Sequence, residues 1–167
     1  GGEMNKDYVR TAFSRGNTRR AMKEIAQQLN AEIVAIDDGA DRNGFSGFMS
    51  AGRDAMRRST APLKPFTTDK PIEEYKMVIV GSPVWAGRCA SPVRGLLKRR
   101  GLEMSRVSYV ITRSGTRRCE SVFDQMDLYT KEKHMFDVSL QPGSVGYAFW
   151  RDKFIGDVKR HLEENDG

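Results

Sequence analysis

The chain has little cysteine and lacks any long apolar run. Two cysteines among 167 residues cannot form the disulfide framework of a small secreted domain, and such a low content fits a reducing compartment. No apolar stretch is long enough to cross a bilayer, and no charged-then-apolar secretory leader is recognised. We therefore expect a cytoplasmic protein with no membrane partner.

Clusters of metal ligands and hydrolytic triads are also lacking. The two histidines, His134 and His161, do not form a group with cysteines and carboxylates at metal-ligand spacing. No Ser-His-Asp or Cys-His arrangement of a nucleophile can be assembled. The sequence therefore predicts no metal site and leaves catalytic residues unassigned.

Positive charge is in excess, with 28 Lys and Arg against 22 Asp and Glu, a net charge of +6 and a pI near 9.5. Such a balance suits an anionic partner such as a phosphate or a nucleotide. No aromatic residues alternate with the basic pairs, as single-stranded nucleic acid would require, so the pattern argues against nucleic acid. The pairs are Arg19-Arg20, Arg57-Arg58, Arg99-Arg100 and Arg117-Arg118.

Apolar residues make up 38% of the chain, enough for one core, and we expect a single domain over residues 4–167. Gly1, Gly2 and Glu3 precede Met4 and are expected to be a cloning remnant. Predicted strands alternate with predicted helices, which favours an α/β fold: a doubly wound, five-stranded parallel sheet of order 2-1-3-4-5 with helices on both faces. The strands are expected at 8–13, 33–36, 77–80, 107–112 and 135–140, and the helices at 18–29, 45–58, 92–100, around 122–129 and over 150–162. Gly101 is expected to close the helix over 92–100, and one side of the last helix is expected to be lined at near-fourfold spacing by Trp150, Phe154, Val158 and Leu162.

The segment Gly81-Ser-Pro-Val-Trp-Ala-Gly-Arg88 is the most informative part of the chain. It follows the apolar run Met77–Val80, typical of a buried strand, and precedes a helix with Ser91 as the expected cap and Pro92 at its first position. A strand, a loop and then a helix form a crevice edge where flat ligands bind in α/β sheets. Trp85 would either lie against such a ligand or cover the sheet edge.

Two more polar loops are expected beside this one. Ser14–Thr18 follows the first strand and enters a helix, and Thr112–Arg117 follows the fourth strand. In a right-handed doubly wound sheet all three loops lie at the carboxyl edge of the strands. The hydroxyls, glycine and first helical amides of Ser14–Thr18 could hold a phosphate, with an ordinary Thr-capped helix as the alternative.

Three motifs together resemble flavodoxin-like FMN proteins: Phe13-Ser-Arg-Gly-Asn-Thr-Arg-Arg20, the Gly81–Arg88 segment and Thr112-Arg-Ser-Gly115. Gly44–Ala55 is similar to the Gly/Phe-rich helix that some members carry before the third strand. The resemblance covers roughly residues 8–164. It implies FMN as the cofactor, with electron transfer or the reduction of a small acceptor such as a quinone as the activity.

The same resemblance assigns the candidate cofactor-binding residues. Loop 14–18 would hold the phosphate, residues 82–87 would line the ribityl chain and the isoalloxazine ring, and residues 112–115 would flank the other edge of the ring. An arginine at the pyrimidine end, Arg88, Arg113 or Arg117, would stabilise the negative charge of the reduced flavin. The full set is Ser14, Arg15, Gly16, Asn17, Thr18, Ser82, Pro83, Val84, Trp85, Ala86, Gly87, Thr112, Arg113, Ser114 and Gly115.

The chain departs from the family pattern at two places. The phosphate loop usually reads Ser-x-Thr-Gly-x-Thr, and here the residue between Arg15 and Gly16 is missing. Arg10 and Thr11 also stand where a central strand is normally apolar. The alternative function is therefore a flavodoxin-shaped binding or regulatory module that has lost FMN. NAD(P)H, a redox partner protein and a homodimer are left open as partners.

Both cysteines follow predicted ligand loops. Arg88 precedes Cys89, and Arg117 and Arg118 precede Cys119. Neighbouring cations lower the pKa of a thiol, which suggests a redox-sensitive pair beside the site. The alternative is a pair of reduced, partly buried thiols.

Overall fold

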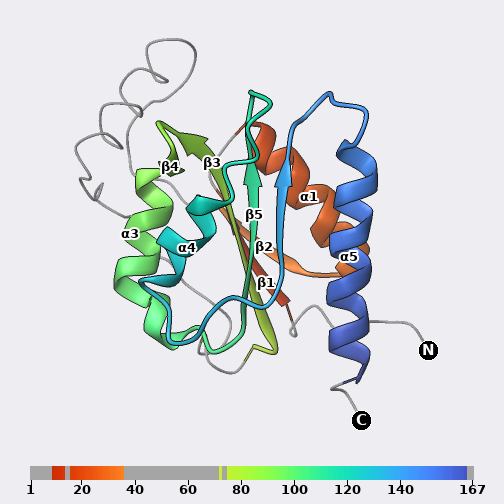
Figure 1. Cartoon of the computed structure of the whole chain (residues 1–167). Coiled ribbons are helices and arrows are strands. Elements are labelled where there is room, and N and C mark those ends of the chain that lie inside the picture. The colour runs from red at the N-terminus through yellow and green to blue at the C-terminus, as the bar shows by residue number, and fades with distance from the viewer. Residues whose placement is uncertain (1–8, 14–15, 36–71, 73–74, 165–167) are drawn as a thin grey trace.

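The computed structural model describes residues 9–13, 16–35, 72 and 75–164 (Figure 1). The expected helix at 45–58 and the Ser14-Arg15 pair of the first loop lie outside these residues. Within them, no helix is long and apolar enough to cross a membrane.

The fold is α/β, with a mostly parallel sheet and helices, which confirms the predicted class. The sheet runs in the order β2-β1-β3-β5-β6, each neighbouring pair being parallel, and a short β4 pairs antiparallel with β3. The strands are β1 (Val9–Phe13), β2 (Glu32–Ala35), β3 (Met77–Trp85), β4 (Arg88–Cys89), β5 (Val107–Thr112) and β6 (Asp137–Leu140).

Helices cover both faces of the sheet (Figure 1). One face packs against α1 (Asn17–Leu29) and α5 (Tyr147–Glu164). The other packs against α3 (Ser91–Arg100) and α4 (Ser121–Asp127), with a 3-10 turn, η3 (Gly101–Glu103), after α3. Figure 1 shows β5 and β6 pointing toward the edge where α1 and α5 begin, so this edge holds the carboxyl ends of the strands.

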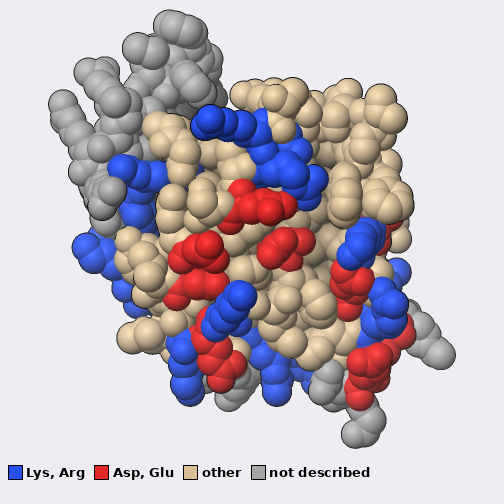
Figure 2. Space-filling model, viewed as in Figure 1, with Lys and Arg blue, Asp and Glu red and all other residues tan. Residues whose placement is uncertain are grey.

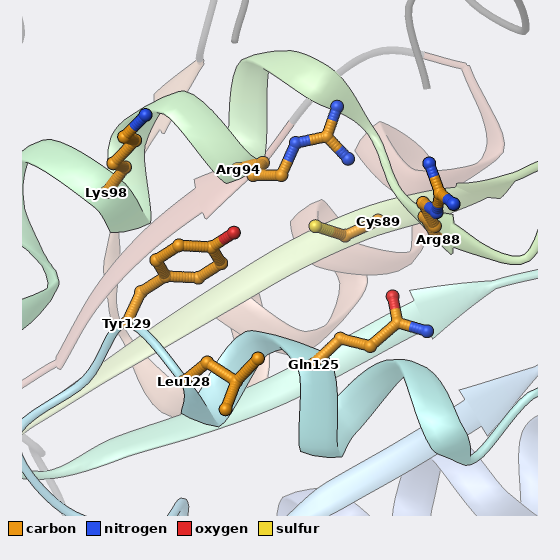
Figure 3. Close-up of a pocket in the computed structure, with 7 residues that line it drawn as sticks. All are labelled: Arg88, Cys89, Arg94, Lys98, Gln125, Leu128 and Tyr129. Atoms are coloured by element: carbon orange, nitrogen blue, oxygen red, sulfur yellow. The ribbon is translucent and has the colours of Figure 1, made fainter. Parts of the chain in front are cut away.

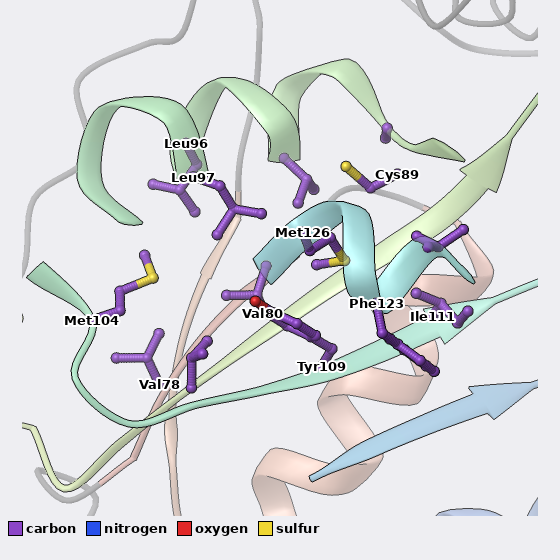
Figure 4. Close-up of a cluster of buried hydrophobic side chains, with 14 of the residues drawn as sticks. Val78, Val80, Cys89, Leu96, Leu97, Met104, Tyr109, Ile111, Phe123 and Met126 are labelled. Carbon is purple, nitrogen blue, oxygen red and sulfur yellow. The ribbon is translucent and has the colours of Figure 1, made fainter. Parts of the chain in front are cut away.

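Strand β3 is apolar without alternation because both of its faces are covered. Met77 and Ile79 belong to the cluster under α1 and α5, whereas Val78 and Val80 belong to the cluster under α3 and α4 (Figure 4). Each of the four is at most 3% exposed. Truncating such a side chain to alanine typically costs about 2–5 kcal/mol, so this strand anchors the two layers to each other.

The ends of α3 differ from expectation. Ala90 is the N-cap and Ser91 already lies in the helix, so the expected serine cap is wrong. Gly101 has right-handed backbone angles and does not end the helix in the left-handed conformation. Glycine is needed here because the backbone at position 101 packs closely against that of Tyr129, and an added Cβ would lie 2.2 Å from the Tyr129 carbonyl oxygen.

The closing helix buries Phe154, Val158 and Leu162 as expected, but not Trp150. Trp150 is 37% exposed, and the guanidinium of Arg118 lies 5.0 Å from its ring centre. The first turn of α5 therefore presents an indole at the carboxyl edge instead of packing it into the core.

Candidate functional site

The first turn of α1 has the features of an anion site. Gly16 is the N-cap, with φ of 77° and ψ of −131°, and among the described residues no side chain caps the helix. The first amides of a helix have no acceptor within it, and here no acidic residue stands in the first turn. Gly16 and Asn17 are exposed, as are Arg19 and Arg20. These amides and cations can meet an anion from solvent.

Thr18 differs from its neighbours because its side chain is fully buried. Its Oγ1 lies 2.6 Å from Oγ1 of Thr112, at the end of β5, in a buried hydrogen bond. The Thr18 hydroxyl therefore has an internal partner in Thr112. The bond fixes the start of α1 to the end of β5, so two of the predicted loops meet.

The expected loop over 82–88 is wrong in form. Strand β3 continues to Trp85, a two-residue turn follows, and β4 returns with Trp85 opposite Arg88. Ala86 and Gly87 both have positive φ, 52° and 76°, which is the pattern of a type I′ hairpin turn. The segment is a rigid hairpin because this turn matches the twist of the strands it joins.

Two hydrogen bonds hold the hairpin in place. The amide of Ala90 donates to Oγ of Ser82 over 2.8 Å, and the Ser82 hydroxyl donates to the Pro83 carbonyl over 2.8 Å. At the tip, Nε2 of Gln125 donates to the Gly87 carbonyl over 3.3 Å. The buried Ser82 hydroxyl is thus engaged within the chain, and α4 supports the turn.

Strand register brings the hairpin to the other two loops. Pro83 in β3 lies opposite Thr112 in β5, and Thr112 is the partner of Thr18. The residues predicted from three distant segments therefore converge at one edge. Val84 and Trp85 are half-buried against the core, whereas Ala86 and Gly87 are exposed.

The loop after β5 is closed by its own side chains. Nε of Arg113 donates to Oγ of Ser139 over 2.8 Å, and Nη1 donates to the Gly115 carbonyl over 2.7 Å. Nε2 of Gln141 donates to the Ser114 carbonyl over 3.2 Å. Arg113 braces the loop, and Ser114 and Gly115 are left exposed. The bracing residues Ser139 and Gln141 carried no motif that sequence reasoning could use.

Basic side chains gather at this edge of the sheet. The connection after β5 contributes Arg117 and Arg118, both exposed. Figure 2 shows Lys and Arg side chains along the edge, above a group of Asp and Glu side chains on the same face. Figure 2 shows further Lys and Arg side chains at the left and lower margins of this face, so positive charge is not confined to the carboxyl edge. Trp150 lies against the guanidinium of Arg118 and adds an aromatic side chain to the edge.

Cys89 does not have the lowered thiol pKa that its arginine-rich surroundings suggest. Neither cysteine forms a disulfide, and Cys89 is buried. Burial raises the pKa of the Cys89 thiol to about 11, and the opposing effect of Arg94 is smaller. The expected lowering of this thiol pKa is therefore wrong, since loss of water outweighs the nearby cation.

No protein-family model and no curated protein matches this chain. Solved structures, in contrast, do match this chain. A flavoprotein from Lactobacillus acidophilus, solved in complex with FMN, is 18% identical to this chain with a TM-score of 0.64. The superposition covers 86% of this chain and 98% of that protein. The flavodoxin, WrbA-like protein of Agrobacterium tumefaciens is 11% identical with a TM-score of 0.53, at coverages of 92% and 98%.

A third similar structure, general stress protein 14 of Treponema denticola in complex with FMN, is 7% identical with a TM-score of 0.50, covering 93% of this chain and 98% of its own. Likeness at such low identity is a likeness of backbone architecture. Together with the parallel sheet and its two helical layers, it confirms the resemblance at the level of the fold. The chain has the flavodoxin-like fold.

Proposed function

We propose that the chain binds FMN at the carboxyl edge of its sheet. The observation that carries this proposal is the convergence of three segments there, through the Thr18–Thr112 hydrogen bond and the Pro83–Thr112 pairing. Two solved structures with similar folds contain FMN, which supports the choice of cofactor. Bound FMN would supply one- or two-electron redox chemistry, and the protein would set its position and surrounding charge.

The start of α1 fits the phosphate. Its uncapped amides and the exposed side chain of Asn17 offer hydrogen-bond donors, and Ser14 and Arg15 are proposed to complete the loop. Arg19 and Arg20 would oppose the helix dipole in the absence of an anion. A bound phosphate dianion would turn this unfavourable placement into an attraction. Thr18 would support the loop from beneath through Thr112.

The ring system fits between the hairpin and the loop after β5. We assign Trp85 and the turn residues Ala86 and Gly87 to one side, and Ser114 and Gly115 to the other. Ser82 and Arg113 would act by holding these segments, since both are engaged within the chain. Arg88 and Arg117 remain the proposed cations at the pyrimidine end.

The proposed activity is electron transfer, as a carrier or as a reductase of a small acceptor such as a quinone. The exposed Arg117 and Arg118 at this edge favour an anionic electron donor such as NADPH. Anaerobic mixing of the FMN-loaded protein with NADPH tests this choice through bleaching of flavin absorbance. NADH, with one phosphate fewer, is the matched control and should react more slowly.

Titration with FMN tests the binding itself. We expect a shifted flavin absorption spectrum and quenching of tryptophan fluorescence, because an indole close to the flavin ring transfers its excitation. Trp85→Phe should weaken FMN binding, whereas Trp150→Phe should leave the affinity unchanged. If the titration gives neither a spectral change nor quenching, the protein is instead the alternative, a flavodoxin-shaped module without cofactor.

Riboflavin has the ring system of FMN but lacks the phosphate. The difference between the affinities for FMN and riboflavin therefore measures what the phosphate site contributes. FMN should bind at least tenfold more tightly, as expected from about 1.5–3 kcal/mol for one charged hydrogen bond. Equal affinity would contradict the assignment at the start of α1. Inserting threonine between Arg15 and Gly16 restores the family spacing and should tighten FMN but not riboflavin.

A further inference from the structure

A cavity of about 330 Å³ lies between α3 and α4 (Figure 3). It is lined by residues from three elements. Strand β4 supplies Arg88 and Cys89, α3 supplies Arg94 and Lys98, and Gln125, Leu128 and Tyr129 come from α4 and the two residues that follow it. Its volume is at the lower end of the range of pockets that hold small molecules.

The lining of the cavity is strongly positive. Three of its seven residues are Arg or Lys, and none is Asp or Glu. Arg94 is only 7% exposed, so its guanidinium acts in surroundings that screen charge less than water does. Lys98 lies one helical turn further along α3 and is exposed. The cavity is therefore cationic from its buried wall to its rim.

The wall opposite these cations is apolar and aromatic. Figure 3 shows Arg94 and Lys98 on α3, across from Leu128 and Tyr129. The separation of the two walls is fixed at one end, because Gly101 packs against the carbonyl oxygen of Tyr129 too closely to admit a Cβ. At the other end Gln125 is bonded to the hairpin turn at Gly87. The cavity is thus preformed.

We propose that this cavity binds a small phosphate monoester that carries a single aromatic ring. The lining offers two guanidinium groups and an ammonium group, which are donors that suit the several oxygens of a phosphate. Tyr129 and Leu128 offer a surface for the ring. The volume of about 330 Å³ suits a ligand of this size. The cavity shares Arg88 with the FMN proposal, whereas Arg94, Lys98 and Tyr129 belong to the cavity alone.

Calorimetric titration of the full chain with phenyl phosphate tests the inference. Phenol lacks the charge and inorganic phosphate lacks the ring, so phenyl phosphate should bind more tightly than either. Lys98→Gln should weaken binding about fivefold, the effect of roughly 1 kcal/mol for an exposed ion pair. Arg99→Gln is the matched control, since Arg99 is also exposed, is next in sequence and does not line the cavity. Both substitutions are at exposed positions and should leave the fold intact.

Arg94→Lys keeps the charge but removes the fork, and it should weaken phenyl phosphate more than Lys98→Gln does. Its unfolding midpoint in urea shows whether the variant is folded. No saturable binding of phenyl phosphate would overturn the inference, as would equal affinities in Lys98→Gln and Arg99→Gln. Binding that is insensitive to Lys98→Gln but sensitive to Arg19→Gln would place the ligand at the start of α1, which would also overturn it.

Discussion

His134 is held between two carboxylates, with its Nδ1 2.8 Å from Oδ2 of Asp127 and its Nε2 2.7 Å from Oδ2 of Asp137. The hydroxyl of Tyr109 also donates to Asp127, over 2.8 Å, and the imidazole lies 4.9 Å from the Tyr109 ring. The loop between α4 and β6 is therefore fastened to strand β5 by one polar network.

Replacing His134 should destabilise the protein because the Asp127 carboxylate, 15% exposed, would lose its main partner. We expect His134→Ala to lower the free energy of unfolding by about 2 kcal/mol, below the 3–5 kcal/mol of a fully buried pair. Asp137→Asn is the control. Its carboxylate is 45% exposed, so its loss should cost less than about 1 kcal/mol. Urea denaturation measures both, and equal losses would contradict this account of the network.

Gly101 and Gly81 should respond differently to alanine. At Gly101 the new Cβ would meet a backbone oxygen at 2.2 Å, whereas at Gly81 it would meet the flexible side chain of Met22 at 2.7 Å. We expect Gly101→Ala to cost about 3 kcal/mol and Gly81→Ala about 1 kcal/mol, in the range of overpacked cores. Thermal unfolding of the two variants gives the comparison, and the reverse order would be inconsistent with the structure.

The hairpin turn contains a residue in an unfavourable conformation. Ala86 has a φ of 52°, which costs a residue with a Cβ about 1 kcal/mol or more. Asparagine is preferred at this position of a type I′ turn, so Ala86→Asn should stabilise the fold by about 0.5 kcal/mol. Ala86→Val should do the opposite, because a β-branched side chain tolerates positive φ poorly. Chemical denaturation curves of the two variants should shift in opposite directions.

The Cys89 thiol should be unreactive at neutral pH. Its pKa is raised from 9.0 to about 11 by burial, and the thiolate is the reactive form. In Cys119→Ser protein, labelling of the remaining thiol should be slow at pH 8 and should accelerate toward pH 11 or in denaturant. Because the folded pKa exceeds the unfolded one, the stability that Cys89 contributes is complete below pH 9 and is lost as the pH rises through 11. Rapid labelling at pH 8 in folded protein would contradict this assignment.

Sequence reasoning succeeded where burial dictates the pattern. Met77–Val80 could be predicted as a strand because both of its faces are covered, and Val107–Thr112 followed from the same signal. The candidate loops also lie together at one edge. Parallel strands with helical crossovers leave little choice in where their carboxyl ends meet.

The errors have physical causes too. Residues four apart in a helix differ in direction by about 40°. Trp150 and Leu162 are three such steps apart, so their directions differ by about 120°, and Trp150 does not face the core as Leu162 does. At the hairpin, Ala86 occupies a position at which type I′ turns prefer asparagine. The turn could therefore not be recognised from the sequence, which predicts a loop there. The partner of Thr18 could not be foreseen, because 94 residues separate it from Thr112 and no local propensity acts over that distance.

That separation also governs when the edge can form during protein synthesis. While the chain is being made, the first turn of α1 emerges from the ribosome long before β5 exists, and Thr18 has no partner hydroxyl until Thr112 follows. Contacts between distant segments form late and slowly. Any ligand held between these two loops can therefore be fully enclosed only after most of the domain has been translated, and an N-terminal fragment ending before Thr112 would lack one of the two loops that hold it.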